Sequence, residues 1–345
     1  MQYVKAVCVV LLNLAGLLVS AQSFELNTAS DGKGDSGYWT KWDSTHNRLL
    51  MYRDSSSPDT PSARVLSGSG TSVPIFILHD FRDAKFADIW AAAATPEGGM
   101  ILSVVIGFGD RPTPETASSK PIPPAKVFLL TYGPDGALKK VWNVAPYLHE
   151  ALAVDPSGNV FALGTRDAGP EGFPMLIKYS PAGSVLGEFV SSKMFANGDK
   201  VLKGSPVNGP SGLFLRNQQL LLWVSSSREA FRLSLTGDLR RKIAVGSALD
   251  RLAVQNGFAQ ATIAELALDD SGGLLLQVRF WPSKTSLAGM MLGMVSIPSD
   301  GSEAKLVGPL TAASSGTQHF LGIAEDGKNV VIEHAGNGRA LVHKE

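Results

Sequence analysis

The stretch ALAVDPSGNVFALG, from Ala151 to Gly164, decides the fold. It consists of an apolar run, a turn segment that begins at Asp155, and a second apolar run. Two short apolar runs on either side of a Gly-containing turn are typical of a β-hairpin. The architecture therefore depends on whether this hairpin occurs once or is repeated along the chain.

The hairpin is repeated. Five further segments share its form: YWTKWDSTHNRLLMY (38–52), IWAAAATPEGGMILSVV (89–105), LFLRNQQLLLWV (213–224), AELALDDSGGLLLQV (264–278) and LGIAEDGKNVVIE (321–333). If Asp155 begins the turn, the equivalent positions are Ser44, Thr95, Leu215, Asp269 and Ala324, which follow one another at intervals of 51 to 60 residues. A regular interval of this size indicates a repeat architecture.

A second hairpin follows most of these copies. The segments are KVFLLTYGPDGALKKVW (126–142), MLIKYSPAGSVLGEFV (175–190), EAFRLSLTGDLRRKIAV (229–245) and MLGMVSIPSDGSEAKLV (291–307). Their turns, PDG, PAG, LTG and SDG, place Gly where a tight turn needs a positive φ. Each repeat is therefore expected to contain four short strands.

The first strand of each repeat is rich in small apolar residues, as in AAAA (91–94) and ALAV (151–154), whereas later strands alternate polar and apolar residues. A strand buried on both faces near a crowded axis favours this composition. The pattern predicts an all-β fold, a six-bladed β-propeller of four-stranded blades. The strand-like segment 23–28 is expected to supply the outer strand that the last blade lacks and to close the ring. Five or seven blades follow if segment 38–83 is misassigned. Almost no helix is expected after residue 21.

The copies LAVDPSGNVFALG and LIKYSPAGSVLGEF resemble the repeats of secreted six-bladed propellers of the NHL and gluconolactonase type. The resemblance extends over nearly the whole chain after residue 21. Its motifs are structural turns, so they specify a fold rather than an activity.

Residues 1–21 have the form of a secretory signal peptide: Lys5, then an apolar run, then Val19-Ser20-Ala21. Removing these 21 of the 345 residues leaves a single predicted domain, 22–345, of 324 residues without cysteine, because the only Cys is Cys8. An exported chain without disulfides needs a large core and suits bacterial secretion or the periplasm.

The composition excludes some partners. Lys and Arg number 31, as do Asp and Glu. A balanced charge without a basic cluster argues against nucleic acid as a partner. No apolar run after residue 21 is long enough to span a membrane. The mature protein is expected to be a monomer.

The expected site lies on one face of the propeller. Connections inside the hairpins are short, whereas segments 53–63, 107–125, 165–173 and 280–289 are long and belong to the same face as the links between blades. Binding residues concentrate on loops that a rigid scaffold holds. At this face the inner strands begin, and their polar residues are the candidate ligand-binding residues of the channel mouth: Asp88, His149, Glu150, Glu265, Gln318 and His319. The alternative is a water-filled polar channel without a function.

The chain has no HExxH or GxSxG motif and no Cys after residue 21. The favoured function is therefore a binding scaffold for a protein, peptide or glycan, rather than an enzyme. The alternative is a metal-dependent hydrolase, because the resemblance to gluconolactonases implies a divalent cation such as calcium in the channel. In that family an Asp of the sequence PDGLAVD is a metal ligand, and HEALAVD of this chain has Glu150 at that place. A second family ligand, an Asn, corresponds to Asn208 two residues out of register, and the third has only Asp35 as a counterpart.

Overall fold

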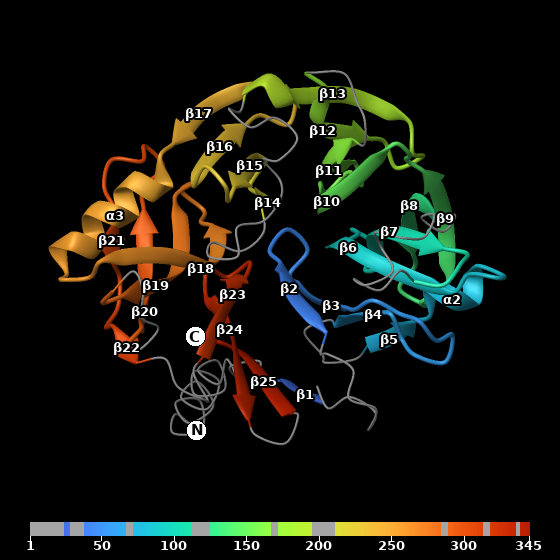
Figure 1. The fold of residues 1–345 in the computed structure, drawn as a ribbon, viewed down its shortest axis with the longest axis horizontal. Coiled ribbons are helices and arrows are strands. Elements are labelled where there is room, and N and C mark those ends of the chain that lie inside the picture. The colour runs from blue at the N-terminus through green and yellow to red at the C-terminus, as the bar shows by residue number, and fades with distance from the viewer. Residues whose placement is uncertain are drawn as a thin grey trace, which may run out of the picture.

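A computed structural model of the chain describes residues 24–27, 38–66, 72–111, 125–166, 172–194, 211–283, 289–312, 318–335 and 339–345. Its strands form six antiparallel sheets arranged around a central axis, each sheet with its first strand innermost (Figure 1). The chain is thus a six-bladed β-propeller, as the repeats predict.

The blades follow one another in chain order. Blade 1 has β2 (Trp39–Asp43), β3 (Arg48–Tyr52), β4 (Ala63–Leu66) and β5 (Ser72–Ile75), and blade 2 has β6 (Phe86–Ala94), β7 (Met100–Gly107), β8 (Ala125–Tyr132) and β9 (Leu138–Asn143). Blade 3 has β10 (Tyr147–Val154), β11 (Val160–Arg166), β12 (Pro174–Tyr179) and β13 (Val185–Ser191), and blade 4 has β14 (Gly212–Arg216), β15 (Gln219–Val224), β16 (Glu229–Leu233) and β17 (Leu239–Ile243).

Blades 5 and 6 depart slightly from this plan. Blade 5 has β18 (Gln260–Leu268), β19 (Leu274–Trp281) and β20 (Met291–Ile297), and two short strands, β21 (Lys305–Leu306) and β22 (Thr311–Ala312), pair with the outer side of β20. Blade 6 has β23 (Gln318–Ile323), β24 (Asn329–Ala335) and β25 (Arg339–Lys344), and its fourth strand is β1 (Phe24–Asn27).

The two ends of the chain meet in blade 6. Strand β1 runs antiparallel to β25, with Phe24 opposite Val342 and Asn27 opposite Arg339. This pairing gives blade 6 a fourth strand from the other end of the sequence and covers the edge that β25 would otherwise expose. The predicted closure of the ring by the N-terminal strand is confirmed.

The repeated turn of the sequence is an Asp-centred turn in the structure. The Asp155 carboxylate accepts hydrogen bonds from the backbone N–H groups of Ser157 and Asn159 at 2.9 and 2.8 Å, and Gly158 has φ +80°. The equivalent in blade 4 differs from the expectation. Leu215 lies within β14, and the turn is the pair Asn217 and Gln218, both with positive φ.

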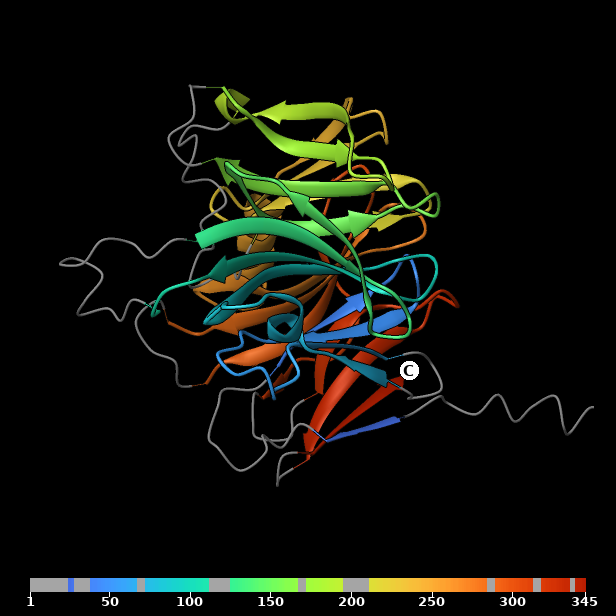
Figure 2. The ribbon, with the colours of Figure 1, turned by 90° about the vertical axis from the view of Figure 1, so that its right-hand side faces the viewer.

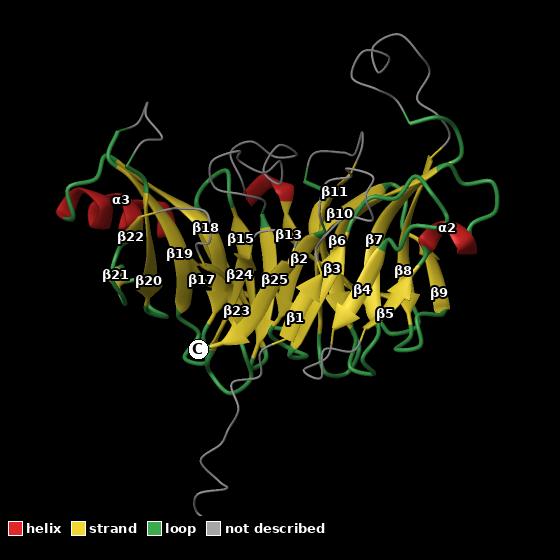
Figure 3. Cartoon of the chain, turned by 90° about the horizontal axis from the view of Figure 1, so that it is seen from below, coloured by secondary structure: helices red, strands yellow, loops and turns green. Residues whose placement is uncertain are grey.

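The two faces of the ring differ. Because each blade is an antiparallel meander, the links between blades share a face with the connections from second to third strands. Figure 2 shows the strands running from one face to the other. The three described helices, α2 (Ile77–Asp80), η1 (Ser192–Met194) and α3 (Val245–Gln255), all lie in links between blades, toward the upper face in Figure 3. We call this the long-loop face and the opposite one the turn face.

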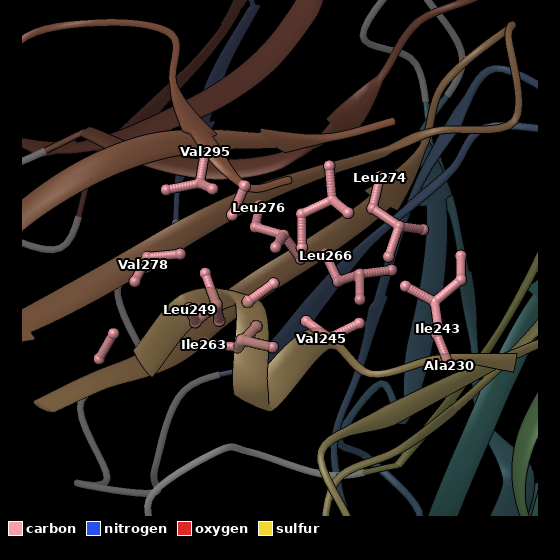
Figure 4. Close-up of a cluster of buried hydrophobic side chains, with 14 of the residues drawn as sticks. Ala230, Ile243, Val245, Leu249, Ile263, Leu266, Leu274, Leu276, Val278 and Val295 are labelled. Atoms are coloured by element: carbon pink, nitrogen blue, oxygen red, sulfur yellow. The ribbon is translucent and has the colours of Figure 1, made fainter. Parts of the chain in front are cut away.

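The sequence analysis did not predict α3. One face of this helix, including Val245, Leu249 and Leu252, is buried against blade 5, where Ile263 and Val278 belong to the same core cluster (Figure 4). These residues recur at the spacing of an amphipathic helix. The helix fills the outer space between blades 4 and 5.

Within the described ranges, no helix is both long and apolar enough to cross a bilayer. The predicted signal peptide, residues 1–21, lies outside the described residues, so its cleavage stays a prediction.

Candidate functional site

The candidate site is a cavity on the propeller axis, which we call the axial cavity. Its volume is about 470 Å³, and residues of all six inner strands line it. Among the described residues of the lining, seven are aromatic (Tyr38, Trp39, Trp42, Tyr52, Trp90, Phe214 and Trp223), two carry carboxylates (Glu150 and Glu265) and one is a lysine (Lys41). Ligand pockets commonly have this size and this mixture of apolar walls with a few polar groups.

Irregularities in the inner strands help to shape the cavity. The pairing of first and second strands shifts around Trp90 in blade 2, Glu150 in blade 3, Ala264 in blade 5 and Leu321 in blade 6. Each of these four residues is the extra residue of a β-bulge, and each lines the axial cavity. A bulge interrupts the alternation of a strand and re-aims a side chain. The bulges therefore bring side chains to the axis that strict alternation would place differently.

The inner hairpin of blade 1 limits the cavity toward the turn face. The Lys41 ammonium donates hydrogen bonds to the carbonyl oxygens of Ala92 in blade 2 and Leu152 in blade 3, both at 3.1 Å. In the turn after β2, the Thr45 hydroxyl donates to the carbonyl of Leu215 in the opposite blade at 2.7 Å. Figure 1 shows this hairpin reaching into the centre of the ring. Beyond it, on the turn side, lies a small pocket of about 30 Å³. We call Lys41, Ala92 and Leu152 the floor of the cavity.

Two tryptophans are open to the cavity. Trp39 is 50% exposed and Trp90 is 46% exposed, although both lie on strands of a closed ring. The Trp39 ring lies against that of Tyr52, with centroids 5.7 Å apart and planes tilted by 43°. Large aromatic side chains are normally covered in a folded protein. These rings offer apolar faces for a ligand to cover.

The cavity also changes the ionisation of its polar groups. Burial raises the pKa of the Glu265 carboxyl to about 7, although the Leu266 N–H bond and the charges of Lys41 and Arg279 oppose the shift. Burial likewise lowers the pKa of the Lys41 ammonium, and the Asp43 and Glu265 carboxylates offset part of that change. Burial raises the pKa of Tyr52 to about 12, and the charge of Glu265 adds to it. Shifted groups of this kind in a concave site mark candidates for function.

Two of the six predicted channel residues line the cavity. Glu150 is the bulge residue of β10, and Thr165 Oγ1 lies 3.5 Å from its carboxylate. Glu265 follows the bulge of β18. The structure thus brings these carboxylates from blades 3 and 5 to the same cavity, and their role in binding stays a prediction.

His149 does not face the channel, which corrects the prediction. Its side chain is fully buried in blade 3, where its Nε2 lies 3.0 Å from the Tyr179 hydroxyl and its ring stacks on Tyr147. Burial lowers the pKa of His149 to about 3, so the ring is neutral near pH 7. The bulge explains the difference, because it gives the axial position to the following residue, Glu150.

Three other predicted residues, Asp88, Gln318 and His319, are described and do not line the axial cavity. Asp88 pairs with Arg111, which also lies 3.6 Å from Asp54. Gln318 is exposed and borders a separate cavity of about 410 Å³ between blades 5 and 6, and His319 is exposed at the start of β23. Asn208 and Asp35 lie outside the described residues.

The described residues do not fit a metal centre. No group of three or more His, Cys, Asp or Glu side chains among them is placed to hold a metal ion. Glu150 and Glu265 are the two carboxylates among the described residues that line the axial cavity. Hard divalent cations take six or more oxygen ligands. Among the described residues the axial cavity thus supplies two candidate carboxylates, and the other two candidate ligands, Asn208 and Asp35, lie outside the described residues.

Sequence reasoning missed the aromatic lining and the floor lysine. The segment YWTKWD predicts no more than a strand, although it contributes Tyr38, Trp39 and Lys41 to the site. One signal was present in the repeat. Trp90 stands five residues before its turn residue Thr95, the same offset that singles out Glu150 before Asp155.

Comparison with known proteins gives fold likeness alone. No family model matches the chain, and no curated protein matches it. A gluconolactonase from Xanthomonas campestris is similar at 15% identity over 96% of this chain and 92% of that chain, with a TM-score of 0.45. A protein of unknown function from Bacteroides caccae is similar at 12% identity over 81% and 83% of the two chains, with a TM-score of 0.43. No activity follows from likenesses at this level.

Proposed function

We propose that the protein is an exported binding protein whose axial cavity holds a saccharide of one or two sugar units. The observation that carries the proposal is the pair of half-exposed tryptophans, Trp39 and Trp90, in a cavity of about 470 Å³ that also contains carboxylates. The binding-scaffold hypothesis allows a protein, a peptide or a glycan as the ligand, and the proposal selects the glycan.

The chemistry of a sugar suits this lining. The C–H face of a sugar ring is apolar and covers an aromatic face, while its hydroxyl groups need polar partners at the edges. Trp39 and Trp90 come from neighbouring blades 1 and 2, and Glu150 and Glu265 come from blades 3 and 5. Stacking groups and hydrogen-bonding groups thus surround the same volume.

The size of the cavity argues against a protein partner at this site. A stable protein interface buries about 800 Å² on each side over a broad surface. The axial cavity is instead concave and ends at the Lys41 floor. A small ligand that enters from the long-loop face fills it more completely than a folded partner does.

Isothermal titration calorimetry with glucose, galactose, glucosamine, cellobiose and maltose tests the proposal. We expect saturable binding of at least one saccharide, weakened about tenfold or more by Trp90→Ala, because removing one stacked ring costs roughly 1–2 kcal/mol. The matched control is Trp142→Ala, which removes a tryptophan of β9 that lines a different cavity, between blades 2 and 3. Absence of saturable heat for the whole panel contradicts the proposal, as does equal weakening by both variants.

A further inference from the structure

Acidic side chains outnumber basic ones among the described residues that line the axial cavity. The described lining contains two carboxylates, Glu150 and Glu265, and one ammonium, Lys41. Lys41 already donates to the carbonyls of Ala92 and Leu152, and an ammonium has three N–H donors. Most of its hydrogen-bonding capacity therefore serves the floor rather than a ligand.

Glu265 has no ion pair with a described Lys, Arg or His side chain at contact distance. Its carboxylate accepts a hydrogen bond from the N–H of Leu266 at 3.2 Å, and Lys41 and Arg279 act on it through their charges from farther away. Burial still outweighs these influences. A cation brought into contact with this carboxylate would replace the hydration that burial has removed.

The exposed aromatic rings favour the same charge. The face of a tryptophan or tyrosine ring carries negative electrostatic potential, and a cation within about 6 Å of the ring centre is attracted to it. Trp39, Tyr52 and Trp90 line the cavity together with Glu265. The aromatic rings and the carboxylates therefore both attract a positively charged ligand.

We infer that the saccharide held in the axial cavity is an amino sugar, bound with its free amino group protonated; the inference rests on the proposed function. The ammonium group donates hydrogen bonds to the Glu265 carboxylate, while the sugar ring covers the exposed faces of Trp39 and Trp90. A neutral hexose has a hydroxyl at that position, which donates one hydrogen bond to the carboxylate but brings no positive charge to pair with it.

Calorimetric titration of the wild-type protein with glucosamine, glucose and N-acetylglucosamine at pH 7 tests the inference, because these sugars differ only at one substituent. We expect glucosamine to bind at least about tenfold more tightly than the other two, because its ammonium forms an ion pair with the buried carboxylate that neither of the other two sugars can form. Equal affinities for the three sugars overturn the inference and leave the proposed function standing. Absence of binding by all three, with the larger panel also silent, overturns both.

Two variants test whether the Glu265 carboxylate is the group that contacts the amino group of the sugar. We expect Glu265→Gln to reduce the preference for glucosamine over glucose to less than about threefold, because the amide is isosteric but carries no charge. The control is Glu97→Gln, an exposed carboxylate at the β6–β7 turn on the turn face, which keeps the wild-type preference. An unchanged preference in the folded Glu265→Gln variant overturns the inference. Folding is verified by the far-ultraviolet dichroism of both variants.

Discussion

The pKa of Glu265 reflects how far the axial cavity shields this carboxyl from water. Its carboxyl has a pKa of about 7 in the folded protein, against an ordinary value of 4.5, because burial disfavours the charged form. Between these two values the unfolded chain is ionised while the folded chain holds the proton. This residue's contribution to stability is therefore full below about pH 4.5 and is lost as the pH rises through about 7.

We expect Glu265→Gln to raise the free energy of unfolding above pH 7 by about 1–3 kcal/mol, since the amide has no charge to desolvate. Near pH 4.5 the same substitution should change it by less than about 0.5 kcal/mol, because the wild-type carboxyl is then neutral when folded. Urea denaturation at a series of pH values measures both. Glu97→Gln is the control on an exposed carboxylate. A stabilisation that does not depend on pH contradicts the assigned burial.

At the floor of the cavity, Lys41 joins blades 1, 2 and 3 through its two hydrogen bonds. We expect Lys41→Met to cost about 1–3 kcal/mol, because the carbonyls of Ala92 and Leu152 lose a charged donor in a buried position. Thermal denaturation with and without a bound saccharide measures the loss. A variant as stable as the wild type would show that the lysine does not hold the floor.

At the scale of elements, helix α3 extends the hydrophobic core of blade 5 beyond its strands. Leu249 is fully buried against blade 5, whereas Val254 on the same helix is 73% exposed. We expect Leu249→Ala to lower the free energy of unfolding by about 2–5 kcal/mol and Val254→Ala to change it by less than about 0.5 kcal/mol. Chemical denaturation of both variants gives the comparison. Similar losses in the two would mean that α3 is not packed on the blade core.

The elements also show what the sequence reveals. Turn signals such as the Asp155 segment act locally, so the hairpins, the blade count and the closing strand are recognisable without a structure. The bulges at Trp90 and Glu150 depend on how the strands pair, and in the sequence they share only an offset of five residues before the turn residue. The side chains that face the axis therefore could not be assigned reliably, and the sequence pattern places His149 there instead of in the blade core. Helix α3 was missed because its apolar stripe is only 11 residues long.

At the scale of the whole molecule, the ring depends on four residues at the beginning of the described chain. Strand β1 covers the edge of β25. Deleting residues 24–27 should expose this edge, lower the melting temperature and promote association between molecules, because unpaired strand edges pair with other chains. Calorimetry and light scattering measure the two effects. A monomeric deletion variant with an unchanged melting temperature contradicts the closure of the ring by β1.

A further prediction at this scale concerns export and the removal of residues 1–21. We expect the exported protein to begin near Gln22 and to contain no thiol, since the Val19-Ser20-Ala21 boundary follows the only cysteine, Cys8. Mass spectrometry of the protein from the periplasm or the culture medium determines its first residue. A mass that includes residues 1–21 would show that the segment is retained.

The central claim is that the axial cavity holds the ligand, and a crystal structure of the protein soaked in glucosamine tests it most directly. The account predicts density for one sugar ring between Trp39, Trp90 and Glu265, with its amino group within about 3 Å of the Glu265 carboxylate. Density for the sugar outside this cavity, at the blade 5–6 cavity or on the turn face, with the axial cavity holding only water, would contradict it.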